Sequence, residues 1–179
     1  DCGVAFGGLA GLGIAGGAEG AGAADAPRGA ARRQRTERTP VWLMRQAGRA
    51  DPEYVKLREQ ADLPLEAVFR DADLCAELSL LPKRIGVDAI IFFQDILTPL
   101  APMGARFVFR PGPQLESPVR TPSDIEGLRD YDVAGELNFV TETLRLVRNS
   151  LEGSLPVLGF AGAPFTLACF LIEGRSPGR

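Results

Sequence analysis

The chain has 179 residues, of which 45% are hydrophobic and 24% charged, a length and balance typical of one globular core. The net charge of −3 argues against the basic face of a nucleic-acid-binding protein, and no apolar run reaches the roughly 18 residues of a membrane-spanning helix. There is no histidine, and the three cysteines form no CxxC pair, so the sequence predicts no metal site, Ser-His-Asp triad or Cys-His pair. We therefore expect neither a nucleic-acid nor a membrane partner, and any catalysis must use carboxylates and arginines.

Residues 1–38 differ in composition from the rest of the chain. They hold nearly half of the glycines, end in the basic run ARRQRTER and lack periodic apolar residues. We predict a disordered Gly/Ala/Arg-rich extension over 1–38 and a folded part over 39–179. The extension is rich in arginine, as a transit peptide is, but it lacks the expected serines, and a spurious upstream extension of the reading frame is the alternative.

The folded part opens with strand and helix signals in alternation. PVWLMR, residues 40–45, is a short apolar run that predicts a strand. A helix should follow, with Asp51 as N-cap and Pro52 at its first position. One face of this helix carries Tyr54, Leu57 and Ala61. A second helical stripe, which Gly86 should end, consists of Leu74, Leu78, Leu81 and Ile85.

The middle of the chain predicts extended structure. DAIIFFQDIL, residues 88–97, has a continuous apolar core that is typical of a parallel strand buried on both faces. ARFVFRPGP, residues 105–113, predicts a further extended piece. Thr121 and Pro122 should open a short helix.

The last third repeats the pattern. Gly153 should close a helix whose apolar face consists of Leu137, Val140, Leu144, Val147 and Leu151. PVLGFAGAPFTLACFLIEG, residues 156–174, predicts a strand, a glycine-rich turn and a helix. The order of strands and helices favours an α/β fold with a parallel sheet.

In such folds, ligands meet the loops at the carboxyl ends of the strands. Arg45 and Arg49 follow the first predicted strand, and their planar guanidinium groups would suit a substrate rich in carboxylates. Two solvated arginines are the alternative. Asp95 ends a strongly apolar strand, where burial should raise its pKa or demand a partner. A cap for the following turn is the alternative there.

The glycines of GFAGAP, residues 159–164, allow either close approach of a ligand or a tight turn. This turn lacks the G-x-G-x-x-G pattern of a dinucleotide site.

Three blocks of the sequence resemble, in order, the signature blocks of the uroporphyrinogen decarboxylase family. They are PVWLMRQAGR with the following PEY, then DAIIFFQDIL, then GFAGAPFTLACFLIEG. The resemblance runs from about residue 39 to the end of the chain. It implies a (β/α)8 TIM barrel, of which this chain holds only about the first half, because such barrels need about 250 residues.

The resemblance also implies a function. The family decarboxylates the four acetate side chains of uroporphyrinogen III to give coproporphyrinogen III in porphyrin (haem and chlorophyll) biosynthesis, and it uses no cofactor. By position, Asp95 matches the aspartate that binds the pyrrole nitrogens, and Arg45 and Arg49 match the substrate arginines. The other substrate-binding positions are Gln46, Ala47, Gly48 and Phe170.

Three residues depart from the family pattern. Ala50 replaces an aromatic residue, Gln94 replaces a small residue, and Phe170 replaces the active-site tyrosine, so a hydroxyl near Asp95 is missing. A barrel methyltransferase of the wider superfamily and a non-catalytic tetrapyrrole-binding relative are the alternatives.

The resemblance further implies a homodimer at full length, located in the cytoplasm or, if the extension is a targeting peptide, in a plastid. We expect the 179 residues alone to be inactive and not to unfold cooperatively, since an open half-barrel leaves apolar faces uncovered.

Overall fold

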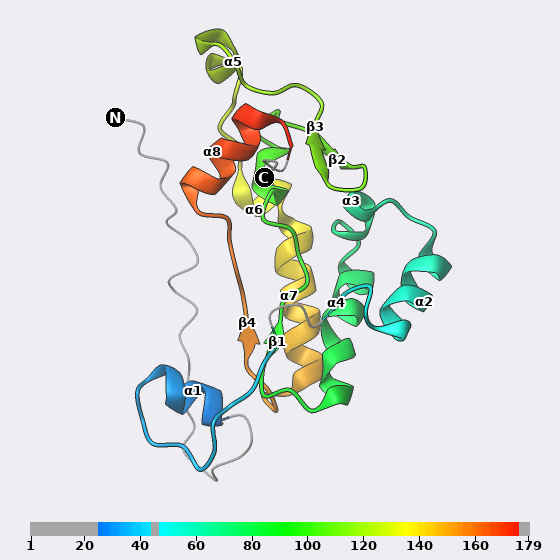
Figure 1. Cartoon of the computed structure of the whole chain (residues 1–179), viewed down its shortest axis with the longest axis vertical. Helices are drawn as coiled ribbons and strands as arrows, with labels where there is room; N and C mark the ends of the chain where they lie inside the picture. Colours follow the sequence, from blue (N-terminus) through cyan, green and yellow to red (C-terminus); the bar gives the residue numbers. More distant parts are fainter. Residues whose placement is uncertain (1–24, 44–46, 176–179) are drawn as a thin grey trace.

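The computed structural model describes residues 25–43 and 47–175, which form short strands among helices (Figure 1). The first half contains α1 (Asp25–Ala31), α2 (Pro52–Ala61), α3 (Leu65–Val68), α4 (Ala72–Leu80), the 3-10 helix η1 (Leu81–Ile85) and β1 (Ile90–Ile91). The second half contains the 3-10 helix η2 (Thr98–Leu100), β2 (Phe107–Phe109), β3 (Pro113–Leu115), α5 (Pro122–Glu126), α6 (Val133–Glu136), α7 (Asn138–Leu151), β4 (Val157–Leu158) and α8 (Pro164–Glu173).

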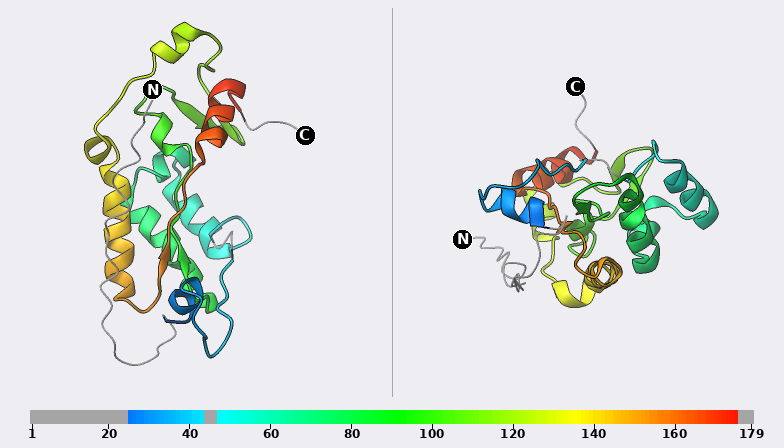
Figure 2. Two further views of the ribbon diagram at one scale, coloured as in Figure 1. Left: turned by 90° about the vertical axis from the view of Figure 1, so that its left-hand side faces the viewer. Right: turned by 90° about the horizontal axis from the view of Figure 1, so that it is seen from below.

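The strands β1 and β4 pair in parallel, with Ile90 opposite Val157 and Ile91 opposite Leu158. The helices α4 and α7 run side by side and pack against this pair (Figures 1 and 2). The core between them consists of Ala76, Val87, Ile90, Val147 and Leu151. The predicted parallel arrangement of 88–97 with the strand that opens 156–174 is therefore confirmed, although the paired part of each strand is short.

Local signals form the helices largely as predicted. Asp51 caps α2 by accepting the N–H of Glu53 at 3.0 Å, and Pro52 occupies the first turn. Thr121 and Asp124 form a capping box at the start of α5. Gly174 ends α8 with a φ of 72°, a left-handed conformation that glycine adopts without steric cost.

The second predicted helical stripe is confirmed with one change. The α-helix ends at Leu80, and the chain continues as the 3-10 helix η1, with Pro82 in its first turn, before Gly86 turns it at a φ of 76°. A 3-10 helix has three residues per turn, so the side chains rotate away from the α-helical stripe. Ile85 is consequently 53% exposed, whereas Leu78 is fully buried.

The predicted apolar face of 137–151 is confirmed as the buried side of α7. Val147 and Leu151 are buried, and Thr143 is buried among them because its hydroxyl donates to the Phe139 carbonyl at 2.8 Å. The helix ends at Glu152, which takes a left-handed φ of 47°, one residue before Gly153.

The predicted extended piece over 105–113 is an antiparallel hairpin of β2 and β3. The hairpin and α8 lie together at the end of the molecule opposite α1 (Figures 1 and 2). A second apolar cluster joins them and consists of Leu97, Leu100, Ala105, Leu115 and Leu167. This cluster lies beneath the turn that follows β1.

The strand predicted for residues 40–45 is wrong where it can be judged. Residues 40–43 form no strand, and residues 44–45 lie outside the described part of the chain. The Asp88 N–H donates to the Val41 carbonyl at 2.8 Å, but the Val41 N–H donates to the Asp88 carboxylate at 2.6 Å instead of to a backbone oxygen. Val41 is thus joined to Asp88 through both the backbone and the carboxylate of the aspartate.

The predicted disorder of 1–38 does not hold for the segment that forms α1. This seven-residue helix buries no side chain. Arg28 Nη1 lies 4.0 Å from Asp25 Oδ1, one turn earlier in the helix. Residues 1–24 lie outside the described part. No helix in the described ranges is long and apolar enough to cross a bilayer.

Candidate functional site

Asp95 lies in the turn after β1 and is half-buried. Its Oδ2 accepts the N–H of Leu97 at 2.9 Å, so the side chain caps its own turn, as one reading of the sequence suggested. Burial raises the pKa of the Asp95 carboxyl from 3.8 to about 6, although the N–H groups of Leu97 and Ile96 lower it. The turn therefore holds a carboxylate that is poorly hydrated and available to a positive charge.

Gln94 joins this turn to two other segments. Its Oε1 accepts the Asp95 N–H at 3.2 Å and the Thr98 hydroxyl at 3.3 Å. Its Nε2 donates to the carbonyl of Phe69, at the end of α3, at 3.2 Å. Gln94, which replaces a small residue of the family pattern, thus forms three hydrogen bonds through its side chain.

The glycine-rich turn before α8 packs against the same loop. A Cβ built on Gly162 would lie 3.4 Å from Ile96 Cβ, an ordinary van der Waals contact, but only 2.6 Å from Leu167 Cδ2, so a larger residue here would displace the Leu167 side chain of α8. Phe170 packs against the cluster that contains Leu97. The structure therefore brings Phe170 and Leu97 of the Asp95 turn to one apolar cluster, and the phenyl ring offers no hydroxyl there.

The arginine loop precedes α2. Arg45 and Gln46 lie outside the described residues, so their roles stay predictions. Ala47 and Gly48 are half-buried, and the Gly48 carbonyl accepts the Asp51 N–H at 2.9 Å as the chain turns into the helix. Arg49 is exposed, and its guanidinium takes part in none of the ion pairs of the described residues.

An aromatic contact holds the helix after this loop beside β1. The ring of Tyr54 lies edge-on to that of Phe93, with 5.8 Å between the centroids. Phe93 stands two residues before Asp95. The structure thus places α2 beside the strand end, but it does not join Arg49 to Asp95.

Phe160 is a candidate that the sequence reasoning missed. It follows β4 by two residues and is 50% exposed. Because β1 and β4 are parallel neighbours, Phe160 and Asp95 lie at the same edge of the sheet. An aromatic residue directly after a strand and before a glycine turn was the available signal.

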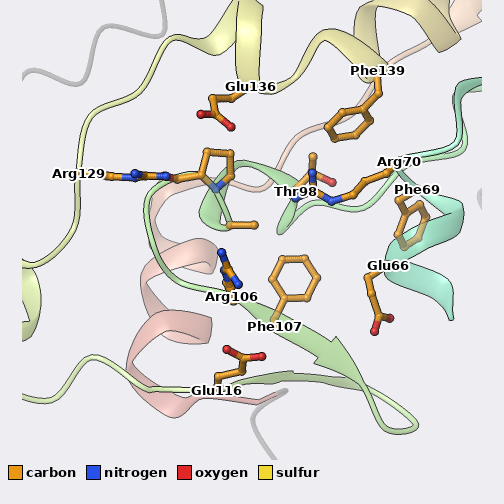
Figure 3. Close-up of a pocket in the computed structure, with 12 residues that line it drawn as sticks. Glu66, Phe69, Arg70, Thr98, Arg106, Phe107, Glu116, Arg129, Glu136 and Phe139 are labelled. Carbon is orange, nitrogen blue, oxygen red and sulfur yellow. The ribbon is translucent and has the colours of Figure 1, made fainter.

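The best-defined pocket lies elsewhere, between the β2–β3 hairpin, α3 and the start of α7 (Figure 3). Its cavity of about 440 Å³ is within the usual range for ligand sites. The charged residues on its wall are Arg70, Arg106, Arg129, Glu66, Glu116 and Glu136.

Two of the pocket arginines are held in place by the fold. Arg70 lies over the ring of Phe139, with its guanidinium carbon 5.3 Å from the centroid, and Arg129 Nε donates to the Pro102 carbonyl at 2.8 Å. The wall has as many carboxylates as guanidinium groups, so its charge selects neither an anion nor a cation. Thr98 is the link between this pocket and the Gln94 network.

Within the described residues, no group of three or more cysteines and carboxylates is placed to hold a metal ion. The site residues that the structure describes include the half-buried carboxylate of Asp95 in the turn after β1 and the exposed guanidinium of Arg49 before α2.

Comparison with known proteins relates this chain to a family. The profile of the uroporphyrinogen decarboxylase (URO-D) family matches residues 25–178. Similar proteins named uroporphyrinogen decarboxylase occur in Syntrophotalea carbinolica, with 51% identity over 76% of this chain and 40% of the relative, and in Trichlorobacter lovleyi, with 49% identity over 78% and 41%. The protein of that name from Sorangium cellulosum is 48% identical over 81% of this chain and 42% of its own length.

The chain thus spans about two fifths of the length of these relatives. Among solved structures, a methyltransferase from Methanosarcina mazei is similar, with a TM-score of 0.66 over 85% of this chain and 45% of that protein. At 19% identity, this likeness concerns the fold alone.

Proposed function

Because this chain belongs to the uroporphyrinogen decarboxylase family, we propose that the full-length protein removes CO2 from the four acetate side chains of uroporphyrinogen III and releases coproporphyrinogen III. The family match supports the fold class predicted from the sequence. That fold is an α/β barrel, of which this chain holds about the first half. The observation that carries the chemistry is Asp95, a half-buried carboxylate with a raised pKa at the carboxyl end of β1.

The reaction needs an electron sink, and a protonated pyrrole can be that sink. Protonation of a pyrrole carbon makes a cationic ring, which accepts the electron pair left by the departing CO2. In our proposal, the Asp95 carboxylate accepts hydrogen bonds from the pyrrole N–H groups and stabilises the positive charge that develops on the ring. Because its ion is poorly hydrated, its attraction to a cation is stronger than that of a carboxylate in open water.

The arginines have a separate role in this proposal. Arg45 and Arg49 hold carboxylates of the substrate that do not react, each through a planar pair of N–H donors. Gln46, Ala47 and Gly48 form the loop between them, and Phe170 with the glycine-rich turn forms an apolar wall. The exposed guanidinium of Arg49 supports this assignment, since no protein carboxylate in the described residues already occupies it.

The remaining proposals follow from the family. We propose that the protein acts in porphyrin biosynthesis, without a cofactor, as a homodimer in the cytoplasm, or in a plastid if the extension is a targeting peptide. We also propose that the 179 residues alone do not decarboxylate uroporphyrinogen, because they span about two fifths of the relatives.

The test is an anaerobic assay of the full-length protein with uroporphyrinogen III. Four CO2 and one coproporphyrinogen III per substrate are expected. The same assay on the 179-residue chain should yield no product. A purified, folded full-length protein that leaves the substrate intact would contradict the assignment.

Two other functions have a specific observation behind them. The methyltransferase from Methanosarcina mazei shares the fold, so the fold alone does not separate a decarboxylase from a barrel methyltransferase, which would contain stoichiometric zinc at full length. The phenyl ring of Phe170 favours a non-catalytic relative, which would bind uroporphyrinogen and release no CO2. Metal content and binding measured beside the assay separate the three functions.

A further inference from the structure

The Gln94 side chain has one orientation that satisfies its three contacts. Its amide oxygen accepts from two donors, the Asp95 N–H and the Thr98 hydroxyl, and its nitrogen donates to the Phe69 carbonyl. Rotating the amide by 180° would set an NH2 group against the Asp95 N–H and an oxygen against a carbonyl. Both pairs would then repel, so the hydrogen bonds define the orientation.

The contact with Phe69 joins the Asp95 turn to another segment. The other two contacts lie within the turn, as does the hydrogen bond between Asp95 Oδ2 and the Leu97 N–H. Gln94 ties the turn to Phe69, which lies 25 residues earlier and is 8% exposed. The Phe69 ring packs against those of Phe93 and Phe109 at centroid distances of 5.3 and 5.8 Å, so the anchor is itself held by its neighbours.

We propose that Gln94 is a positioning residue, which holds the Asp95 carboxylate toward the sheet edge by locking the turn onto the end of α3. The inference rests on the proposed function of Asp95. It adds a residue that touches no substrate and acts through the aspartate. A catalytic carboxylate displaced by about 1 Å can lose most of its effect, so the lock has a kinetic consequence.

The experiment is a double-mutant cycle in the full-length protein. Gln94→Met keeps the length of the side chain and removes all three hydrogen bonds. We expect kcat to fall about tenfold while KM changes less than about twofold, because the carboxylate is misplaced and substrate binding is kept. In an Asp95→Asn background, the same change should have no further effect on kcat, since its effect passes through the aspartate.

The matched control is Gln114→Met. Gln114 also donates its amide to a backbone carbonyl, that of Arg110 at 2.7 Å, but it lies on the hairpin and is exposed. This variant should keep the wild-type kcat. The proposal is overturned if Gln94→Met loses no kcat. It is also overturned if the double variant shows the full kcat losses of Gln94→Met and Asp95→Asn added together.

Hydrogen–deuterium exchange separates this inference from the proposed function. In the full-length protein, the peptide that spans residues 93–98 should exchange faster in Gln94→Met than in wild type, whether or not the protein is a decarboxylase. Unchanged exchange there overturns the lock even if the wild-type protein decarboxylates uroporphyrinogen. Faster exchange in a protein without decarboxylase activity supports the lock and contradicts only the proposed function.

Discussion

An aspartate stands beyond each end of β1, and the fold holds the two carboxyls in opposite ways. On the amino-terminal side, Asp88 is only 3% exposed. Its carboxylate accepts hydrogen bonds from both terminal nitrogens of the Arg38 guanidinium and from the Val41 N–H. The hydrogen bond from Arg38, followed by that from Val41, lowers the pKa of Asp88 to about 2. On the carboxyl-terminal side, the partners of Asp95 within the described residues are the N–H groups of Leu97 and Ile96, and burial raises its pKa to about 6.

The difference lies in the partners of the two carboxyls and not in their exposure. Asp88 is the less exposed of the two, yet its charge is neutralised by the protein itself. It joins the segment before residue 40 to the sheet, which is a structural task. Asp95 forms no ion pair within the described residues, in keeping with the contact to a cationic pyrrole that we propose for it.

The largest expected effect is the loss of activity in Asp95→Asn. Asparagine keeps the shape of the side chain but removes its negative charge, so the cationic pyrrole loses its stabilisation. Decarboxylation by the full-length protein should fall by about 100-fold or more, with an unchanged circular dichroism spectrum. Coproporphyrinogen formation measures the loss. Near-normal turnover would mean that Asp95, like Asp88, is structural.

The same substitution on the amino-terminal side should act on stability instead. Asp88→Asn removes the negative charge to which Arg38 and the Val41 N–H donate. In the full-length protein, we expect the melting temperature at pH 7 to fall by several degrees while kcat stays normal. The folded-state pKa of Asp88 is lowered, so its contribution is present above pH 3.8 and is lost as the pH falls through about 2. The variant should therefore approach wild-type stability near pH 2.

Exposed Asp130 offers the matched control for this change. Asp130→Asn should leave the melting temperature within experimental error across the same pH range. Equal shifts in both variants would show that net charge, and not the contact with Arg38, sets the stability.

The third effect is a gain of stability in the inactive Asp95 variant. The pKa of Asp95 is raised in the folded state, so its favourable contribution is present below pH 3.8 and is lost as the pH rises through about 6. At pH 8, the buried ion destabilises the fold, and Asp95→Asn should be about 2 kcal/mol more stable than wild type. Denaturant unfolding at pH 8 and pH 4 checks this, since the gain should disappear at the lower pH. A destabilised variant at pH 8 would contradict the assigned cause.

The smallest effect should come from the arginine loop. Arg49→Lys and Arg45→Lys keep the charge but lose the planar pair of donors, so we expect KM for uroporphyrinogen to rise by about 3- to 10-fold. Steady-state kinetics on the full-length protein measure it. Unchanged kinetics in both variants would return these arginines to the solvated state that the sequence also allowed.

The sequence by itself determined the features that depend on neighbouring residues. Asp51 with Pro52 and Thr121 with Pro122 mark helix starts because a cap satisfies free N–H groups within about one turn of itself. The apolar run before Asp95 was enough to predict a parallel strand and a buried carboxylate. The order of three sequence blocks was enough to predict the family.

Only the tertiary structure decided which distant residues meet. Arg38 and Asp88 are 50 residues apart, and Gln94 and Phe69 are 25 apart, so neither hydrogen bond leaves a periodic trace in the sequence. The bond from the Val41 N–H to the Asp88 carboxylate is of the same kind, since the two residues are 47 apart. Periodicity reports which face of an element is apolar, whereas the partner of a buried polar group depends on how the elements pack.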